Sequence, residues 1–186
     1  MPMPIKFIET EFPGVLLVQT GCAVDDRGFF AELYSRAVWA ETGFAHEFVQ
    51  DNLSLSRRGV LRGLHYQIEP HGMGKLVRAL AGAVYDVGVD LRKGSPTFGK
   101  WFGCELSAEN RTALWLPSGF AHGFLATEQN TLVYYKCTQV HVPQAERALN
   151  YADPALAIKW PSQPRIVSPK DANAPNLDHA EYNFSF

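Results

Sequence analysis

Hydrophobic and polar residues alternate along much of this chain, and clusters of Gly, Pro, Asn and Ser separate the alternating segments. The clearest segment is AVYDVGVDLR (83–92), where apolar residues fill the odd positions from 85 to 91 and Asp86 and Asp90 stand among the even ones. A period of two is that of a β-strand, so we expect one face of this strand to be buried and the other to carry the carboxylates. Similar patterns at 100–106, 112–117 and 131–140, separated by turns such as KGSPTFG and SAEN, predict an all-β fold of the jelly-roll type.

Helical patterns are few. The segment YSRAVWAET (34–42), which Gly43 closes, predicts one short helix, and the tail after Pro169 has room for one helical turn. With 186 residues, of which 46% are hydrophobic, the chain can bury one sizeable core. No linker, repeat or low-complexity tract interrupts the sequence, so we expect a single domain over residues 1–186 with short peripheral helices.

The charge pattern excludes several classes of partner. The formal net charge is −2 and the Lys and Arg residues are scattered, so nothing predicts binding to nucleic acid or to an anionic membrane. No apolar run approaches the roughly 20 residues that a membrane span needs, and the start MPMPIKFIETEF lacks a basic stretch followed by an apolar one. The three cysteines are an odd number without paired spacing, which favours reduced thiols. We expect a soluble, cytoplasmic protein.

Candidate chemistry begins in VLRGLHYQIEPHGMGKLVRAL (60–80), where two apolar strands carry polar residues toward a loop. Strand alternation puts Leu64 and His65 on opposite faces, so His65 faces the barrel interior if Leu64 packs outward into the second sheet. Lys75, in the next strand, can face the same cavity. Arg62 has the opposite parity to His65 and reaches that cavity only at a strand end or a bulge. A lone histidine or lysine is more often structural or solvated, but the combination of the three points to a site.

A second region is LPSGFAHGF, whose P-x-G-x-x-H order delivers His122 to the start of a strand. This order resembles the second motif of the cupin jelly rolls, in which the histidine often binds a metal. A metal cupin would also offer H-x-H and a carboxylate in its first motif, whereas LHYQ supplies a single histidine, so a ligand set with metal geometry cannot be assembled. We therefore interpret the cavity as metal-free, with His122 as a polar contact to substrate or a structural bridge.

Two further places carry candidate groups. Tyr134 and Tyr135 are neighbours in TLVYYKCTQV, so one of them faces the interior in either register. A buried tyrosine usually serves packing, but a phenol with an unperturbed pKa of about 10 also stays protonated near neutral pH and can donate a proton; we favour Tyr135 for this role. Lys170 and Asp171 lie in a tail that is typical of a solvated turn unless it folds back over the cavity.

The chain contains, in this order, the segments DDRGFFAELY, FVQDN, VLRGLHYQ, GKLVRALAGAVYDVGVDLRKGSPTFG, LSAEN, LPSGFAHGF, YYKCT and VSPKD. Together they closely resemble the dTDP-4-dehydrorhamnose 3,5-epimerase family over nearly the whole length. The resemblance implies a cupin jelly roll, a homodimer, and neither metal nor organic cofactor. It also implies an isomerase that acts on a nucleotide-diphospho-4-keto-6-deoxyhexose of the dTDP-4-dehydro-6-deoxyglucose type and supplies deoxysugars such as rhamnose for surface polysaccharide.

Matching motifs also imply the roles of individual residues. A carbon next to a ketone is weakly acidic, so its inversion needs a base, a group that stabilises the enolate oxygen, and an acid on the opposite face. His65 would be the base with Asp171 bonded to its ring, Lys75 would lie by the C4 oxygen, and Tyr135 would return the proton. The implied binding residues are Arg62, His122 and Lys170 for the diphosphate or sugar, and Arg27, Glu32, Gln50, Asp51, Asn52 and Glu146 for the nucleotide, some of them across a dimer interface.

The chain departs from the family's pattern around the nucleotide. Ala23, Val140 and His141 occupy positions where the family commonly has aromatic residues that sandwich the base, and Leu53 follows QDN where a histidine is common. The identity of the base therefore stays open, as does whether C5, C3 or both are inverted. The alternatives are a cofactor-free nucleotide-sugar ketoisomerase, a non-catalytic sugar-binding cupin and a metal-dependent cupin oxygenase.

Overall fold

The computed structural model describes residues 4–186, so residues 1–3 of the predicted domain lie outside the described part. Its elements, in chain order, are β1 (Ile5–Glu9), β2 (Leu16–Thr20), β3 (Ala23–Asp25), β4 (Gly28–Phe30), α1 (Arg36–Glu41), β5 (Gln50–Ser56), β6 (Val60–Gln67), β7 (Lys75–Ala81), β8 (Ala83–Asp90), β9 (Trp101–Ser107), β10 (Thr112–Leu116), β11 (Phe120–Ala126), β12 (Thr131–Cys137), β13 (Glu146–Ala148), β14 (Ile166–Val167), α2 (Pro169–Ala172) and the 3₁₀ turn η1 (Leu177–His179).

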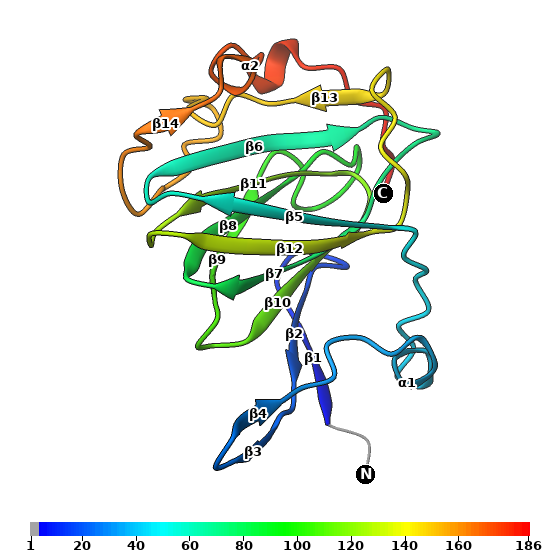
Figure 1. Ribbon diagram of the computed structural model, residues 1–186. Coiled ribbons are helices and arrows are strands. Elements are labelled where there is room, and N and C mark those ends of the chain that lie inside the picture. Colours follow the sequence, from blue (N-terminus) through cyan, green and yellow to red (C-terminus); the bar gives the residue numbers. More distant parts are fainter. Residues whose placement is uncertain (1–3) are drawn as a thin grey trace.

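Two sheets face each other and enclose the interior of a barrel (Figure 1). One has the strand order β1-β2-β10-β7-β12-β5, and the other has the order β13-β6-β11-β8-β9, with β14 beside β6. The chain changes sheet at each step from β5 to β8 and again from β9 to β12, which is the connectivity of a jelly roll. Val77 and Leu114 of the first sheet share a buried cluster with Val84 and Phe124 of the second. The predicted all-β jelly roll is confirmed.

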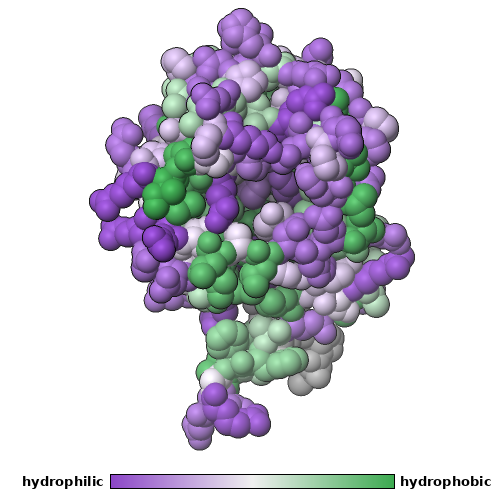
Figure 2. Space-filling view, turned by 45° about the horizontal axis from the view of Figure 1, so that its top comes forward, coloured by the Kyte–Doolittle hydropathy of each residue, from purple (hydrophilic) through white to green (hydrophobic). Residues whose placement is uncertain are grey.

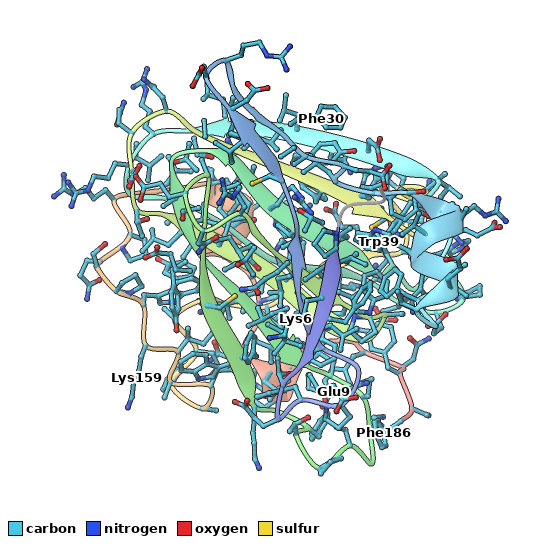
Figure 3. The ribbon with its side chains drawn as sticks, turned by 90° about the horizontal axis from the view of Figure 1, so that it is seen from below. Lys6, Glu9, Phe30, Trp39, Lys159 and Phe186 are labelled. Atoms are coloured by element: carbon cyan, nitrogen blue, oxygen red, sulfur yellow. The ribbon has the colours of Figure 1, made fainter. Side chains whose placement is uncertain are left out.

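Helix α1 and the segment after it cover the outer face of the first sheet. Trp39 points from α1 toward the sheet (Figure 3), where it is buried in one cluster with Phe44, Val18 and Leu76. The helix ends just before Gly43, whose φ of 89° is a left-handed conformation that favours glycine. The predicted helix over 34–42 is therefore confirmed as α1, and the predicted turn after Pro169 as α2.

The C-terminal segment covers the outer face of the second sheet, and this changes how β8 is buried. Leu64, Val87 and Val89 pack there with Leu156 and Phe184, so Leu64 does pack outward, although against the tail and not against another sheet.

One face of β8 is buried and the other carries Asp86 and Asp90, as expected, but these two carboxylates are fully buried as well. A buried carboxylate needs donors, and both have them. His122 bonds Asp86, while Arg92, Ser95 and Thr97 donate to Asp90.

Among residues 4–186, no helix combines the length and the apolar character that a membrane crossing requires.

Candidate active site

A cavity of about 470 Å³ lies between the two sheets, at the end of the barrel that carries α2. Figure 2 shows a hollow lined by hydrophilic side chains on this face. A second lobe of about 280 Å³ adjoins it. Both lobes share His65 of β6, Lys75 of β7 and Tyr135 of β12. Three of the four predicted catalytic residues thus lie where the lobes meet, and Asp171 lines the larger lobe.

A bulge in β6 puts Arg62 and His65 on the same wall of the larger lobe. In the pairing with β11, His65 lies opposite His122 and Arg62 lies opposite Phe124. Three steps along β6 therefore match two steps along β11, and the extra residue reverses the alternation between them. Both side chains line the cavity. The parity conflict predicted for Arg62 is resolved by this irregularity.

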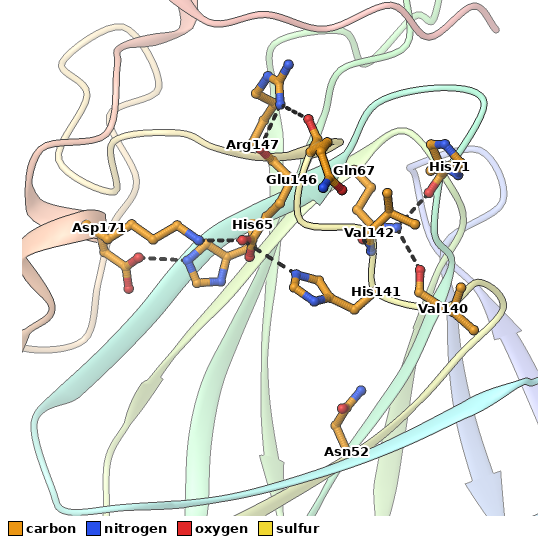
Figure 4. Close-up of polar contacts among 12 residues, drawn as sticks. Asn52, His65, Gln67, His71, Val140, His141, Val142, Glu146, Arg147 and Asp171 are labelled. Atoms are coloured by element: carbon orange, nitrogen blue, oxygen red, sulfur yellow. Dashed lines mark hydrogen bonds and ion pairs between the residues drawn. The ribbon is translucent and has the colours of Figure 1, made fainter.

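His65 and Asp171 form a close pair (Figure 4). His65 Nε2 lies 2.7 Å from Asp171 Oδ1, and the amide of Gly63 donates to Asp171 Oδ2 over 3.2 Å. Asp171 belongs to the four-residue helix α2, and its own amide donates to Oγ of the N-cap Ser168. Burial would raise the pKa of Asp171, but the hydrogen bonds from His65, Gly63 and Ser168 outweigh it and hold that pKa below the usual value. The tail does fold back over the cavity, and it supplies a fixed carboxylate.

Lys75 and Tyr135 contribute a buried ammonium and a half-buried phenol. Lys75 is 9% exposed, and its Nζ donates to the backbone carbonyl of His65 over 3.2 Å. Burial lowers the pKa of Lys75, while the charges of Cys137, Asp86 and Glu146 oppose this shift. Burial raises the pKa of Tyr135, which keeps the phenol protonated at neutral pH. The site therefore holds a proton donor and a cation that both line the cavity.

Asp86 is a partner of the site that the sequence did not reveal. His122 Nε2 lies 3.0 and 3.1 Å from the two oxygens of Asp86, and both residues are buried. Burial lowers the pKa of His122, although the charge of Asp86 works against this. The only signal in the sequence was a carboxylate on an alternating strand. Its pairing with His122 depends on β8 and β11 being neighbours.

The rim between the lobes carries a set of charged and polar side chains (Figure 4). Lys170 Nζ donates to Glu146 Oε2 over 2.6 Å, and His141 Nε2 lies 3.6 Å from the same oxygen. Burial would raise the pKa of Glu146, but the bond from Lys170 keeps it below its usual value. Gln50 and Asn52 of β5 line the smaller lobe beside these groups.

Three of the predicted binding residues lie outside the cavity within one chain. Arg27 is paired with Asp25 on the β3–β4 hairpin, which lies at the far end of the molecule from α2 (Figure 1). Glu32 follows the same hairpin and is exposed. Asp51 is exposed on β5, where Lys136 donates to it over 2.7 Å.

No three His, Cys, Asp or Glu side chains of residues 4–186 are grouped so that they could hold a metal ion. The metal-free interpretation of the cavity stays a prediction.

Comparison with known proteins identifies the family. The family model for dTDP-4-dehydrorhamnose 3,5-epimerase matches residues 9–179 of the chain. The chain belongs to the dTDP-4-dehydrorhamnose 3,5-epimerase family. Membership in this epimerase family makes the protein an isomerase with a cupin jelly roll, as the sequence resemblance implies.

Individual members of the epimerase family agree with this. The dTDP-4-dehydrorhamnose 3,5-epimerase of Shigella flexneri is 48% identical over 179 residues, which cover 96% of this chain and 99% of the relative. A crystal structure of the 3,5-epimerase from Legionella pneumophila in complex with dTDP-4-keto-L-rhamnose has a TM-score of 0.90 at 45% identity, covering 95% of this chain and 94% of that one. ChmJ of Streptomyces bikiniensis, a 3′-monoepimerase solved with dTDP-quinovose, has a TM-score of 0.85 at 34% identity, covering 91% and 86%.

Proposed function

We propose that this epimerase inverts C5, C3 or both in a nucleotide-diphospho-4-keto-6-deoxyhexose, using His65 as the base and Tyr135 as the acid. The observation that carries the proposal is the His65–Asp171 pair at 2.7 Å, beside a buried lysine and a half-buried phenol. Three free cysteines fit a reducing compartment, and we propose that the protein works in the cytoplasm and supplies deoxysugars such as rhamnose.

The hydrogen-bond pattern supports one assignment of the atoms in the proton transfer. Because Nε2 of His65 is bonded to Asp171, its proton lies on that side and the lone pair of Nδ1 is free to accept hydrogen. Nδ1 takes the proton from the carbon next to the C4 ketone, and the electron pair of that C–H bond moves to the C4 oxygen. Asp171 stabilises the imidazolium that forms. The ammonium of Lys75 stabilises the enolate oxygen in a site where burial strengthens the interaction.

Inversion is completed from the opposite side. Tyr135 gives its phenolic proton to the carbon, and the raised pKa of this tyrosine keeps the proton available until then. Solvent returns a proton to Tyr135 and removes one from His65. Arg62, Lys170 and His122 border the larger lobe and fit the diphosphate and the sugar hydroxyls. Gln50, Asn52 and Glu146 border the smaller lobe and fit the nucleotide.

Solvent exchange tests the chemistry. With dTDP-4-dehydro-6-deoxyglucose in D₂O, we expect deuterium at each inverted carbon and no incorporation with His65→Ala. A matched control is His179→Ala, since that side chain is 79% exposed in η1. Tyr135→Phe should still exchange the proton through His65 while inversion is lost. Inversion that survives Tyr135→Phe would assign the acid to another residue.

The same experiment separates the alternatives. A ketoisomerase would return the proton to a different atom, and a sugar-binding cupin would give no exchange at all. The number of deuterated carbons decides between inversion at one centre and at two. Activity assays with several nucleotide sugars would identify the nucleobase of the substrate, which the residues at positions 140 and 141 leave open. Elemental analysis of the active protein tests the metal-free interpretation.

We further propose that the active unit is a homodimer. On the β3–β4 hairpin, Val24, Phe29 and Phe30 are 62–72% exposed, and Leu53 and Leu55 on the outer face of β5 are about as exposed. Two apolar surfaces of this kind favour self-association. Leu53 and Leu55 lie on one face of β5, and Asn52 and Ser54 on the other face line the cavity. The partner's hairpin, packed on β5, would therefore approach the cavity. Arg27 and Glu32 would then serve the partner's site.

Mixing two inactive variants tests this arrangement. In a heterodimer of Arg27→Ala and His65→Ala, one of the two cavities has an intact His65 and an intact Arg27 from the other subunit. Half of the randomly mixed dimers are of this kind, so mixing should restore about a quarter of the normal activity. Light scattering should give the mass of a dimer, and Phe29→Ser with Phe30→Ser should shift it to that of a monomer. No recovery on mixing would mean that Arg27 does not reach the partner's cavity.

A further inference from the structure

Strands β6 and β11 approach each other closely where Gly63 lies against Gly123. A Cβ added to Gly63 would lie 2.5 Å from Gly123 Cα, and one added to Gly123 would lie 2.6 Å from the carbonyl oxygen of Arg62. Contacts this short with backbone atoms cannot be relieved by rotating a side chain, so a methyl group at either position would separate the strands by roughly half an ångström. Only glycine at both positions allows this approach.

The contact coincides with the bulge that arranges the site. Gly63 and Leu64 are the two residues between Arg62 and His65, and they face the single residue Gly123 across the ladder. Gly63 has a φ of +119°, which side-chain-bearing residues rarely adopt. The close approach therefore fixes the point at which alternation reverses and at which Arg62 and His65 come to share a wall.

The other edge of β6 explains why Asp171 fits at this point. There, β14 pairs with Val60 and Leu61, and β13 pairs with residues 65–67. The two short strands leave a gap beside Gly63, whose amide points into it and donates to Asp171. The carboxylate thus bridges the bulged backbone and the His65 ring.

We propose that Gly63 and Gly123 are positioning residues for catalysis. Their contact sets the distance between the base and the phosphate-binding Arg62, and it aims the Gly63 amide so that Asp171 holds His65 in one orientation. This inference rests on the proposed roles of His65 and Asp171. It assigns a catalytic consequence to two residues that carry no functional group.

The decisive variant is Gly123→Ala, because Gly123 has no left-handed φ and alanine is strained there only by contact. We expect kcat to fall about 10²-fold, since a small misplacement of a base is costly. The Kd for dTDP should change less than about threefold, because the phosphate contacts move together with Arg62. Gly88→Ala is the matched control. Gly88 lies on β8, opposite His122 of β11. A Cβ added to it would lie 2.6 Å from the Leu116 side chain in the core, away from β6. Because the Leu116 side chain can move, Gly88→Ala should lower the melting temperature no more than Gly123→Ala does, with kcat within about threefold of normal.

A measurement that leaves both glycines in place supports the test even if a glycine variant fails to fold. Labelling with ¹³C-arginine and ¹⁵N-glycine selects the amides that follow arginine, namely Gly28, Gly59 and Gly63. The Gly63 amide signal should shift in Asp171→Asn and stay in place in Asp178→Asn. Equal kcat losses in Gly123→Ala and Gly88→Ala, or a Gly63 amide signal that does not shift in Asp171→Asn, would overturn the positioning role. Full activity of His65→Ala would instead overturn the proposed function itself.

Discussion

Replacing Asp171 with asparagine removes a charge while nearly preserving shape, and the geometry of its two contacts predicts a large loss of activity. The carboxylate accepts from the Gly63 amide through one oxygen and from His65 Nε2 through the other. Asparagine offers one acceptor and one donor in the same places. If its oxygen faces Gly63, its NH₂ donates to Nε2, the ring proton moves to Nδ1, and the base loses its lone pair. If its oxygen faces His65, the Gly63 amide meets an NH₂ group and has no acceptor.

The magnitude can be worked out from these two arrangements. An unsatisfied buried donor costs about 1–3 kcal/mol, so the productive arrangement is populated in roughly one molecule in 5 to one in 150. The imidazolium also loses a charge-assisted hydrogen bond, which is worth about another tenfold. Together these terms predict a fall in kcat of about 10²- to 10³-fold without unfolding.

Two measurements check this prediction. Steady-state inversion gives kcat, and ¹⁵N spectra of labelled histidine show which nitrogen of His65 carries the proton. Asp178→Asn is the control, because that carboxylate is 72% exposed on the same tail. A kcat for Asp171→Asn within about fivefold of normal, or a ring that keeps its proton on Nε2, would refute the reasoning.

Three further predictions concern the same site. Burial lowers the pKa of Lys75, so the folded protein binds fewer protons than the unfolded chain at alkaline pH. The free energy of unfolding, compared with that of Lys75→Met, should therefore rise and not fall as the pH increases toward about 10.4. Urea titrations of both proteins measure it. Burial raises the pKa of Tyr135, so we expect the fall in kcat at alkaline pH to come from deprotonation of Lys75 and not of Tyr135. The rate of proton exchange by Tyr135→Phe in D₂O should therefore fall at alkaline pH in the same way. Ser168→Ala removes the acceptor for the Asp171 amide, which should lower kcat about fivefold and the melting temperature by about 2–4 °C, as kinetics and calorimetry would show.

Local patterns determined much of this protein. The alternation of apolar and polar residues predicted the main strands, and Gly43 and Pro169 marked the end of one helix and the start of another, because backbone preference and burial act over a few neighbouring residues. The same alternation predicted that His65 faces the interior. Of the positions that match family motifs, Lys75 and Tyr135 also line the cavity, whereas Arg27, Glu32 and Asp51 do not.

Only the tertiary structure decided how these groups meet. Arg62 shares a wall with His65 because β6 slips by one residue against β11. A register shift of this kind depends on how two strands pair, here with Gly63 against Gly123, and not on the sequence of one strand alone. Asp86 is buried because β11 brings His122 to it. Asp171 lies more than 100 residues from His65 in the chain, and the tail's packing on the outer face of the second sheet brings the two within hydrogen-bonding distance. Such contacts arise from long-range packing, which no local pattern in the sequence encodes.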